Sequence, residues 1–276
     1  MLTLALGMYF GTQPFRVSRI YFARDYPTSI VLDRSLVEQI KPILAQPFSY
    51  LDRGRQSFVF ISADNQYVLK FFDSCCLEPC FFSLTSEARL EQKYQRLFSG
   101  YEVAYLRDQD NTGVICAKLG ANLPSPMDVT LIDRLGLHHC VSLQQVPFVL
   151  QHVAVPTRVK ISEWLDQGDV RKAKNALCQL VEMYVDEYEL GLRDRDRNLM
   201  HNTGFIGEKP VRIDAGRLFF HEELIHHRVM ARDLKKIFLG RVGKWLNRHY
   251  PKYRDEILAD MQLELEKVCL QLPGGG

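Results

Sequence analysis

The sequence predicts an α+β protein in which a mostly β front half precedes a mostly helical back half. Two apolar runs separated by polar turn residues make residues 58–72 typical of a β-hairpin. In residues 170–190, apolar side chains instead recur at the spacing of an amphipathic helix. The pattern changes near residues 152–156, which indicates a boundary there.

The composition is that of a folded chain able to bury a sizeable core. The 276 residues are 46% hydrophobic and 25% charged, which excludes collagen, coiled-coil and wholly disordered proteins. The formal net charge of +2 gives no reason to expect a nucleic-acid partner.

The seven cysteines indicate neither a disulfide framework nor a zinc site. The cluster of Cys75, Cys76 and Cys80 lacks a second pair at metal-ligand spacing. Reduced thiols favour a cytoplasmic location, with secretion into a host cell as the alternative.

The chain begins with an apolar run over residues 1–10, too short to cross a bilayer, which takes about 20 residues. We expect a docking strand or helix here, with weak membrane contact as the alternative, and no transmembrane span. The glycine tail, within residues 273–276, is expected to be disordered.

The front half contains the elements of a sheet with one long helix. Residues 30–45 predict a short amphipathic helix, and residues 84–105 predict the long one. Residues 112–119 and 146–155 are predicted strands, joined by a polar, proline-containing connection over residues 121–143.

Lys70 lies in the second run of the predicted hairpin, where an unpaired ammonium group would be costly to bury. It therefore requires an anionic partner. Glu87 and Glu91 lie one turn apart on one face of the long helix, and either could supply the carboxylate.

The back half is predicted to be mostly helical. A short helical turn over residues 161–165 precedes the helix at 170–190, which Gly191 ends. A hairpin over residues 204–213 follows, and then two or three helices between residues 222 and 272, broken at Gly243 and Pro251.

The most informative stretch is a loop rich in Asp, Arg and Asn between the helix and the hairpin. Asp194, Asp196, Asn198 and Asn202 precede the hairpin, and Asp214-Ala215-Gly216 follows it. Carboxylate and amide oxygens around a short hairpin suit Mg²⁺, which takes a few protein ligands together with substrate phosphates. Taken alone, residues 194–197 would be a solvated loop with its own ion pairs.

In the order of these features, roughly residues 50–220 resemble the protein-kinase-like superfamily. The resemblance is to atypical bacterial members, closer to small-molecule and lipid kinases than to eukaryotic protein kinases. It implies a bilobed fold with a small antiparallel-sheet N-lobe and a mainly helical C-lobe. It also implies ATP and Mg²⁺ as cofactors, with Asp214 as a metal ligand.

Two registers fit the catalytic loop that the resemblance implies. Asp196 with Asn202 is the first, because Asp196 precedes Asp214 by 18 residues and Asn202 leads directly into the hairpin. Asp194 with Asn198 is the alternative and resembles the lipid-kinase pattern with one residue deleted. The usual His-Arg before the catalytic Asp is absent in both.

The resemblance also assigns roles in the front half. Lys70 would hold the α- and β-phosphates, Glu87 would orient Lys70, and Gly54 would lie in the loop that covers the phosphates. Gln151 and Val153, with His152 between them, would lie at the hinge that binds adenine. Protein kinases use three glycines in that loop, whereas this chain has one, Gly54. After Asp214 no Ala-Pro-Glu occurs, and residues 217–221 are expected to lead directly into a helix.

These residues predict an ATP- and Mg²⁺-dependent phosphotransferase that acts on a hydroxyl group of a protein or small molecule. The alternative is a pseudokinase that binds nucleotide or acts as a scaffold, and adenylylation is a third chemistry for the same fold. The predicted divisions are an extension over residues 1–49, an N-lobe over 50–153, a C-lobe over 154–272 and the tail.

Overall fold

A computed structural model describes residues 15–78, 85–120, 123–221 and 227–271 of the chain. These residues form a mixed α/β structure, which is consistent with the predicted α+β class. The chain divides into two units, each made of two segments: unit 1 is Met1–Gln95 with Cys116–Gln151, and unit 2 is Arg96–Ile115 with His152–Gly276. The long helix, residues 87–107, is divided between these two units.

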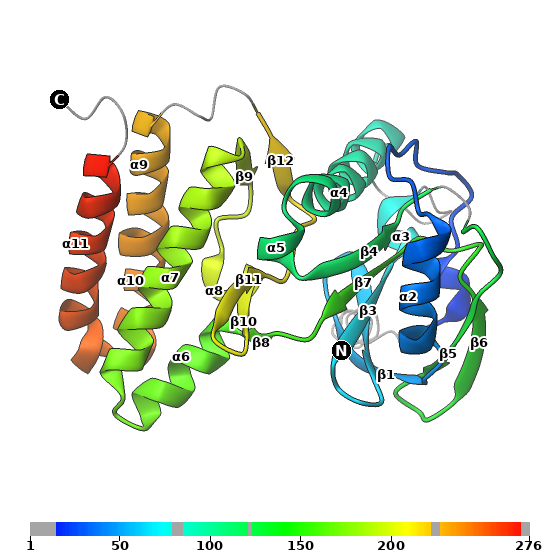
Figure 1. Ribbon diagram of the computed structural model, residues 1–276, viewed down its shortest axis with the longest axis horizontal. Helices are drawn as coiled ribbons and strands as arrows, with labels where there is room; N and C mark the ends of the chain where they lie inside the picture. The colour runs from blue at the N-terminus through cyan, green and yellow to red at the C-terminus, as the bar shows by residue number, and fades with distance from the viewer. Residues whose placement is uncertain (1–14, 79–84, 121–122, 222–226, 272–276) are drawn as a thin grey trace, which may run out of the picture. The chain divides into compact units, whose positions relative to one another are not determined.

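Unit 1 is built on a seven-stranded sheet with the order β4-β7-β3-β2-β1-β5-β6 (Figure 1). Its strands are β1 Phe48–Arg53, β2 Ser57–Ser62, β3 Tyr67–Phe72, β4 Val114–Lys118, β5 Asp128–Ile132, β6 His138–Ser142 and β7 Phe148–His152. The pairs β1–β2, β2–β3 and β5–β6 are antiparallel, whereas β1 and β5 run parallel. The expectation of a small antiparallel sheet was therefore wrong in this respect.

The predicted hairpin is confirmed as β2 and β3, with Phe60 opposite Leu69 and Val59 opposite Lys70. Asn65 turns the chain with a φ of 58°, a conformation that Asn tolerates better than most residues. Phe58 and Phe60 alternate on the buried face of β2. Phe15 packs edge-on against both rings, at centroid distances of 5.2 and 4.9 Å.

The helical elements that begin in unit 1 are η1 Val17–Ile20, α2 Arg34–Leu44, α3 Ser74–Leu77 and α4 Glu87–Arg107. The side chain of Asp33 caps α2 by accepting the Leu36 N–H at 2.8 Å. Both predicted helices are thus confirmed, with the long one shifted by two or three residues.

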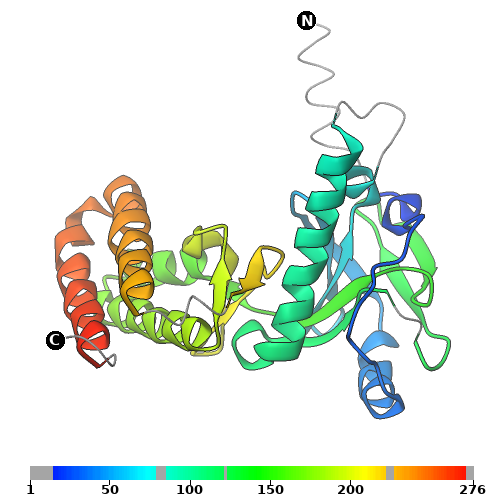
Figure 2. The ribbon, with the colours of Figure 1, turned by 90° about the horizontal axis from the view of Figure 1, so that it is seen from above.

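Unit 2 contains mainly helices, with two small sheets. The helical elements are α5 Gln109–Thr112, α6 Thr157–Asp166, α7 Val170–Glu189, α8 Leu199–Asn202, α9 His227–Lys235, η3 Lys236–Val242, α10 Gly243–His249, η4 Pro251–Tyr253 and α11 Arg254–Gln271. The strands β8 Val155–Pro156, β10 Thr203–Ile206 and β11 Lys209–Arg212 form one sheet, and β9 Leu192–Asp194 pairs with β12 Leu218–Phe220. Figure 2 shows α9 and α11 side by side, and both contact α7.

The predicted helix at 170–190 is confirmed as α7, which carries the core of unit 2. Asp169 caps its start by accepting the Lys172 N–H at 3.1 Å. Gly191 follows its end with a φ of 72°, which favours glycine. Leu177, Leu180 and Tyr184 are fully buried or nearly so in the apolar cluster that α7 forms with α9 and α11.

Three predictions for local structure were wrong. The connection over residues 121–143 contains β5 and β6. β6 is an edge strand with mostly polar, exposed or partly exposed side chains, which hide its strand pattern. Residues after Asp214 form β12 before any helix. The helix passes through Gly243 by way of a π-helical segment, whereas the predicted break at Pro251 is confirmed.

The predictions for residues 1–10, Cys80 and the tail lie outside the described residues.

Candidate functional site

The loop between β9 and β10 carries the acidic and amide side chains that the sequence singles out. Its register is fixed by pairing at both ends, because Asp194 lies opposite Leu218 of β12 and Thr203 lies opposite Arg212 of β11. This loop and the start of the segment after β11 therefore belong to one unit.

Asp194 is buried and acts only as a hydrogen-bond acceptor in its observed contacts. Its Oδ1 accepts the Asp196 N–H at 2.7 Å. Its Oδ2 accepts Arg212 Nη1–H at 2.7 Å and Asn202 Nδ2–H at 3.3 Å. Burial raises the pKa of Asp194 to about 6, against the opposing effect of the Arg212 charge.

Arg212 is fully buried and joins Asp194 to Glu187 of α7. Its Nε–H and Nη2–H groups donate to the two carboxylate oxygens of Glu187, at 2.7 and 2.5 Å. Burial alone would lower the pKa of Arg212, but the adjacent anionic groups, with Glu187 foremost, raise it well above the usual value. The guanidinium therefore stays charged while it holds two carboxylates.

Asn202 connects this buried group to Asp196. Its Nδ2 donates one hydrogen to Asp194 and the other to the Asp196 carbonyl oxygen, at 3.1 Å. With both amide hydrogens used, the orientation of the side chain is fixed and Oδ1 faces away from these bonds. The Asp196 carboxylate is 35% exposed and lies 3.8 Å from Arg217 Nη1.

Asp214 joins the same group through the main chain. The N–H groups of Ile213 and Asp214 both donate to the Asn202 carbonyl oxygen, at 2.8 and 3.2 Å. The exposed Asp214 carboxylate accepts the Gly216 N–H at 3.1 Å through Oδ1, which also lies 3.5 Å from the Tyr101 hydroxyl. Burial raises the pKa of Tyr101 well above its usual value, so the hydroxyl remains a donor.

Two glycines let α4 approach the segment that carries Asp214. A Cβ on Gly100 would lie 2.4 Å from the Ala215 carbonyl oxygen, and a Cβ on Gly216 would lie 2.4 Å from Leu97. Both distances are below van der Waals contact. At Gly100 the obstacle is backbone, so the packing requires glycine there, whereas a Cβ at Gly216 would force the Leu97 side chain to shift.

The arginines of the loop are not paired within it. Arg193 and Arg197 both form ion pairs with Asp233 of α9, and Asp233 also accepts the Tyr188 hydroxyl at 2.9 Å. Arg195 lies over the ring of Phe219, at 4.5 Å from its centroid. The local interpretation of residues 194–197 as a self-paired loop was therefore wrong.

Asn198, the amide of the alternative register, has a different place from Asn202. It precedes α8, and its carbonyl oxygen accepts the N–H groups of His201 and Asn202. Its side chain makes no capping bond. Asn202 contacts both aspartates of the loop, so the structure joins Asp194, Asp196, Asn202 and Asp214.

The remaining predicted residues lie in unit 1, except Val153, which lies in unit 2. Lys70 is buried on β3, in the interior of the sheet. Gly54 follows β1 and donates its N–H to the Ser57 carbonyl oxygen at 2.9 Å, which closes a tight turn. Gln151 is buried on β7, and Val153 follows that strand in unit 2.

Two carboxylates were proposed to meet Lys70. Glu87 is exposed in the first turn of α4. The Glu91 carboxylate forms an ion pair with Arg24 and accepts a hydrogen bond from Gln95 at 2.7 Å. Arg24 and Gln95 therefore use both oxygens of Glu91.

A buried carboxylate that the sequence analysis missed fixes the turn at Gly54. Asp73 is fully buried and accepts Arg19 Nε–H at 3.0 Å and Arg53 Nη2–H at 2.8 Å. Its N–H donates to the Gln56 carbonyl oxygen at 2.8 Å. Since Arg53 and Gln56 flank the turn on both sides, Asp73 ties it to the end of β3.

Arg212, Glu187, Tyr101 and Asp233 were also missed. Only Arg212 carried a usable signal: it is a cation next to the apolar Val211 in a short strand, as Lys70 is in β3. The others lie on helices where a single polar residue is unremarkable in sequence.

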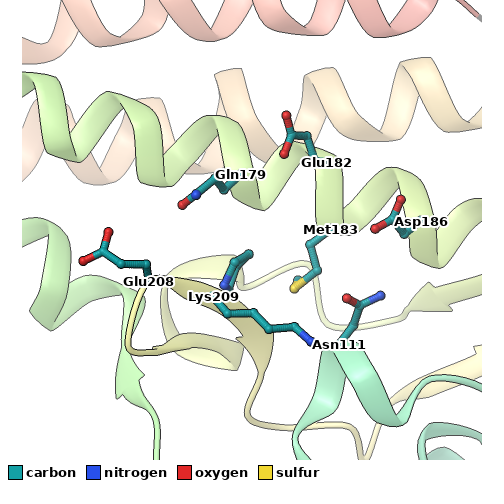
Figure 3. A pocket seen from close by; sticks show the side chains of 8 residues that line it. Asn111, Gln179, Glu182, Met183, Asp186, Glu208 and Lys209 are labelled. Carbon is teal, nitrogen blue, oxygen red and sulfur yellow. The ribbon is translucent and has the colours of Figure 1, made fainter.

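A cavity of about 370 Å³ lies elsewhere in unit 2 (Figure 3). Side chains of α7 line one side, and Lys209 and Asn111 lie opposite them. The lining residues are Asn111, Gln179, Glu182, Met183, Asp186, Glu208, Lys209 and Pro210. None of them belongs to the group around Asn202, so the cavity is a separate feature.

Within the described ranges, no three His, Cys, Asp or Glu side chains are grouped as a metal site. None of the helices in these ranges is long and apolar enough to cross a membrane.

No protein-family model matches the sequence, and no curated protein matches it. Among solved structures the chain is similar to WbdD, described as a bifunctional kinase-methyltransferase. A structure of WbdD at 2.2 Å is 15% identical with a TM-score of 0.43, and the match covers 82% of this chain and 46% of that one.

A medium-resolution structure of WbdD is 13% identical with a TM-score of 0.42, covering 80% and 44% of the two chains. The chain thus spans less than half the length of the WbdD chains that it matches.

Proposed function

We propose that the protein is a kinase-like phosphotransferase that moves the γ-phosphoryl group of ATP to a hydroxyl acceptor with the help of Mg²⁺. The observation that carries the proposal is the contact between Asn202 and both the Asp196 and Asp214 segments. Two carboxylates and an amide oxygen gathered in this way match the charge and the ligands that phosphoryl transfer requires.

The Asp196 and Asn202 register fits this role better than Asp194 and Asn198. The Asp194 side chain is only 2% exposed and already accepts three hydrogen bonds. A carboxylate must be accessible to orient or deprotonate a substrate hydroxyl. Asp196, at 35% exposure, meets that requirement.

The residues of the site fit a magnesium ion with two protein ligands. Both hydrogens of the Asn202 amide are used, so Oδ1 is presented as an acceptor, and Asp214 is exposed with only its Oδ1 engaged in the observed bonds. Mg²⁺ takes few protein ligands and completes its octahedron with waters and phosphates. When bound, it would neutralise phosphate charge.

In the transfer step, Asp196 orients the acceptor hydroxyl and accepts its proton as the oxygen attacks the γ-phosphorus. The bond from that phosphorus to the bridging oxygen breaks, and ADP leaves. Lys70, which is buried on β3, would neutralise charge on the α- and β-phosphates, as the strand lysine of the kinase-like superfamily does.

The other residues of the front half have supporting roles in this proposal. Glu87 is the carboxylate assigned to Lys70, since Glu91 is held by Arg24. The turn at Gly54 would cover the phosphates, and Gln151 and Val153 would bind adenine. Two lobes over residues 50–153 and 154–272, a cytoplasmic location and a protein or small-molecule acceptor belong to the same proposal.

Binding is tested by thermal unfolding with ATP, with and without Mg²⁺. We expect ATP to stabilise the protein, more so with Mg²⁺, by about 2.7 kcal/mol at a ligand concentration 100 times Kd. Asp214→Asn should abolish the Mg²⁺ contribution. Glu208→Gln, an exposed carboxylate of the same unit, is the matched control.

Transfer is tested with radiolabelled ATP and panels of proteins, lipids and small alcohols. Loss of transfer in Asp196→Asn and Asp214→Ala is required. Stabilisation by ATP without any transfer would support the pseudokinase alternative, and a nucleotide-modified product would indicate adenylylation. If ATP does not stabilise the wild-type protein, the proposal is wrong.

A further inference from the structure

We propose that Arg212 is a positioning residue that sets the geometry of the site through Asp194. The effect of Arg212 on catalysis rests on the function proposed above, whereas its effect on the geometry of the loop rests only on its hydrogen bonds. The Arg212 side chain donates hydrogen bonds to Asp194 and Glu187, and its guanidinium lies over the Tyr184 ring at 5.0 Å from the centroid. None of these three residues is assigned to substrate or metal in the proposed function.

The guanidinium group joins three elements that are distant in sequence. Arg212 ends β11, Glu187 lies on α7 and Asp194 ends β9. Nε and Nη2 engage one carboxylate and Nη1 engages the other, so the planar fork fixes their mutual orientation. A lysine could supply the charge but not this geometry.

Asp194 passes this orientation on to the site. Its Oδ1 holds the Asp196 N–H, and its Oδ2 holds the Asn202 amide beside Arg212. All three partners of Asp194 are donors. An asparagine at this position would place its own N–H groups against one of those donors, so the contacts require a carboxylate.

The backbone that follows β11 also contacts the loop directly. Ile213 and Asp214, which follow Arg212 directly, donate their N–H groups to the Asn202 carbonyl oxygen. The side chain of Arg212 and the backbone after it thus act on the same loop, one through Asp194 and the other through Asn202. A shift of Arg212 would be transmitted to Asp196, Asn202 and Asp214 together.

A merely structural role is the competing explanation, because the pair with Glu187 alone would fasten β11 to α7. The two roles are separated by three variants. Arg212→Lys weakens both contacts, Asp194→Asn breaks the branch to the site, and Glu187→Gln weakens only the branch to α7. Lys174→Met is a further control, since Lys174 joins α7 to α11 through Glu256 and Asp260.

The measurement is amide hydrogen exchange in the unliganded full-length protein, resolved by residue with NMR. We expect exchange at the Asp196 amide to accelerate at least tenfold in Asp194→Asn and in Arg212→Lys. Exchange within α7 should change less than threefold. Glu187→Gln and Lys174→Met should leave the Asp196 amide within threefold of wild type.

Equal acceleration at Asp196 in Glu187→Gln and Asp194→Asn would overturn the proposal in favour of the structural role, and so would an unchanged Asp196 amide in Asp194→Asn. If Arg212→Lys does not fold, the comparison of Asp194→Asn with Glu187→Gln still decides.

A second measurement, the stabilisation by ATP, reports on the proposed function. In the presence of Mg²⁺, Asp194→Asn should raise the apparent Kd for ATP at least tenfold. Failure of the wild type to bind ATP would refute the proposed function while amide exchange still decides on Arg212.

Discussion

Asp108 gives the protein a pH-dependent stability that can be worked out from its surroundings. It is 4% exposed at the end of α4; Oδ1 accepts the Asn111 amide at 2.9 Å, and Oδ2 has no hydrogen-bond partner among the described residues. Burial, with the charge of Glu187 as the next cause, raises the pKa of Asp108 from 3.8 to about 7. The protonated acid is therefore the favoured form in the folded state below about pH 7.

The magnitude follows from linkage between proton binding and folding. A tenfold change in proton affinity corresponds to about 1.4 kcal/mol, so ionised Asp108 costs the folded state up to about 4 kcal/mol. Because the folded-state pKa is above the unfolded value, this stability is fully present below about pH 4 and is lost as the pH rises through about 7. Between about pH 5.5 and pH 8.5 the loss amounts to about 2 kcal/mol.

The perturbation is Asp108→Asn, which removes the titration and keeps the shape. Both tryptophans, Trp164 and Trp245, lie in unit 2 with Asp108, so tryptophan fluorescence reports the unfolding of this unit. Urea titrations at the two pH values should show the variant gaining about 2 kcal/mol on the wild type at the higher pH. Asp110→Asn, an exposed neighbour, should follow the wild type.

An Asp108→Asn protein whose stability falls with pH as steeply as that of the wild type would refute this reasoning. The carboxyl group would then be ionised throughout the range, with a compensating partner.

Three further predictions concern folding. Replacing Asp73 by Ala leaves its two arginine partners uncompensated and should cost about 3–5 kcal/mol in urea unfolding, whereas exposed Asp128→Ala should change stability by less than about 0.5 kcal/mol. Gly100→Ala should cost about 1–3 kcal/mol, because its Cβ would collide with the backbone beside Asp214. Gly240→Ala, with open space around the new Cβ, should be neutral or stabilising. Equal melting temperatures of the two variants would contradict the close approach at Gly100. Asp169→Ala removes the cap of α7 and should cost about 1 kcal/mol by tryptophan fluorescence, and an unchanged midpoint would show that the cap contributes nothing.

Elements with a strong local pattern were predictable. The hairpin at 58–72 and the helix at 170–190 combine clear periodicity with turn residues at their ends, and both are confirmed. The strand β6 was missed because it lies at the edge of the sheet and only one of its five side chains is buried. Gly243 was taken as a helix end, whereas its small size serves packing against Leu258.

The site was predictable only as a set of residue types. The sequence placed Asp194, Asp196, Asn202 and Asp214 near one hairpin, but which carboxylate is accessible depends on Arg212 and Glu187. These partners are separated by 18 and 25 residues from their contacts, so no local pattern reveals them. The division of roles between Asp194 and Asp196 is a property of the tertiary structure.

The division of the chain has a consequence for how the protein is made. Unit 2 takes residues 96–115 from the middle of the segments that build unit 1. During synthesis these residues leave the ribosome well before α7 exists, although Gly100, Tyr101 and Asp108 belong to the interior of the later unit. A gene cut at residue 152 would separate Asp214 from Tyr101, so the two halves cannot be exchanged between proteins as independent modules.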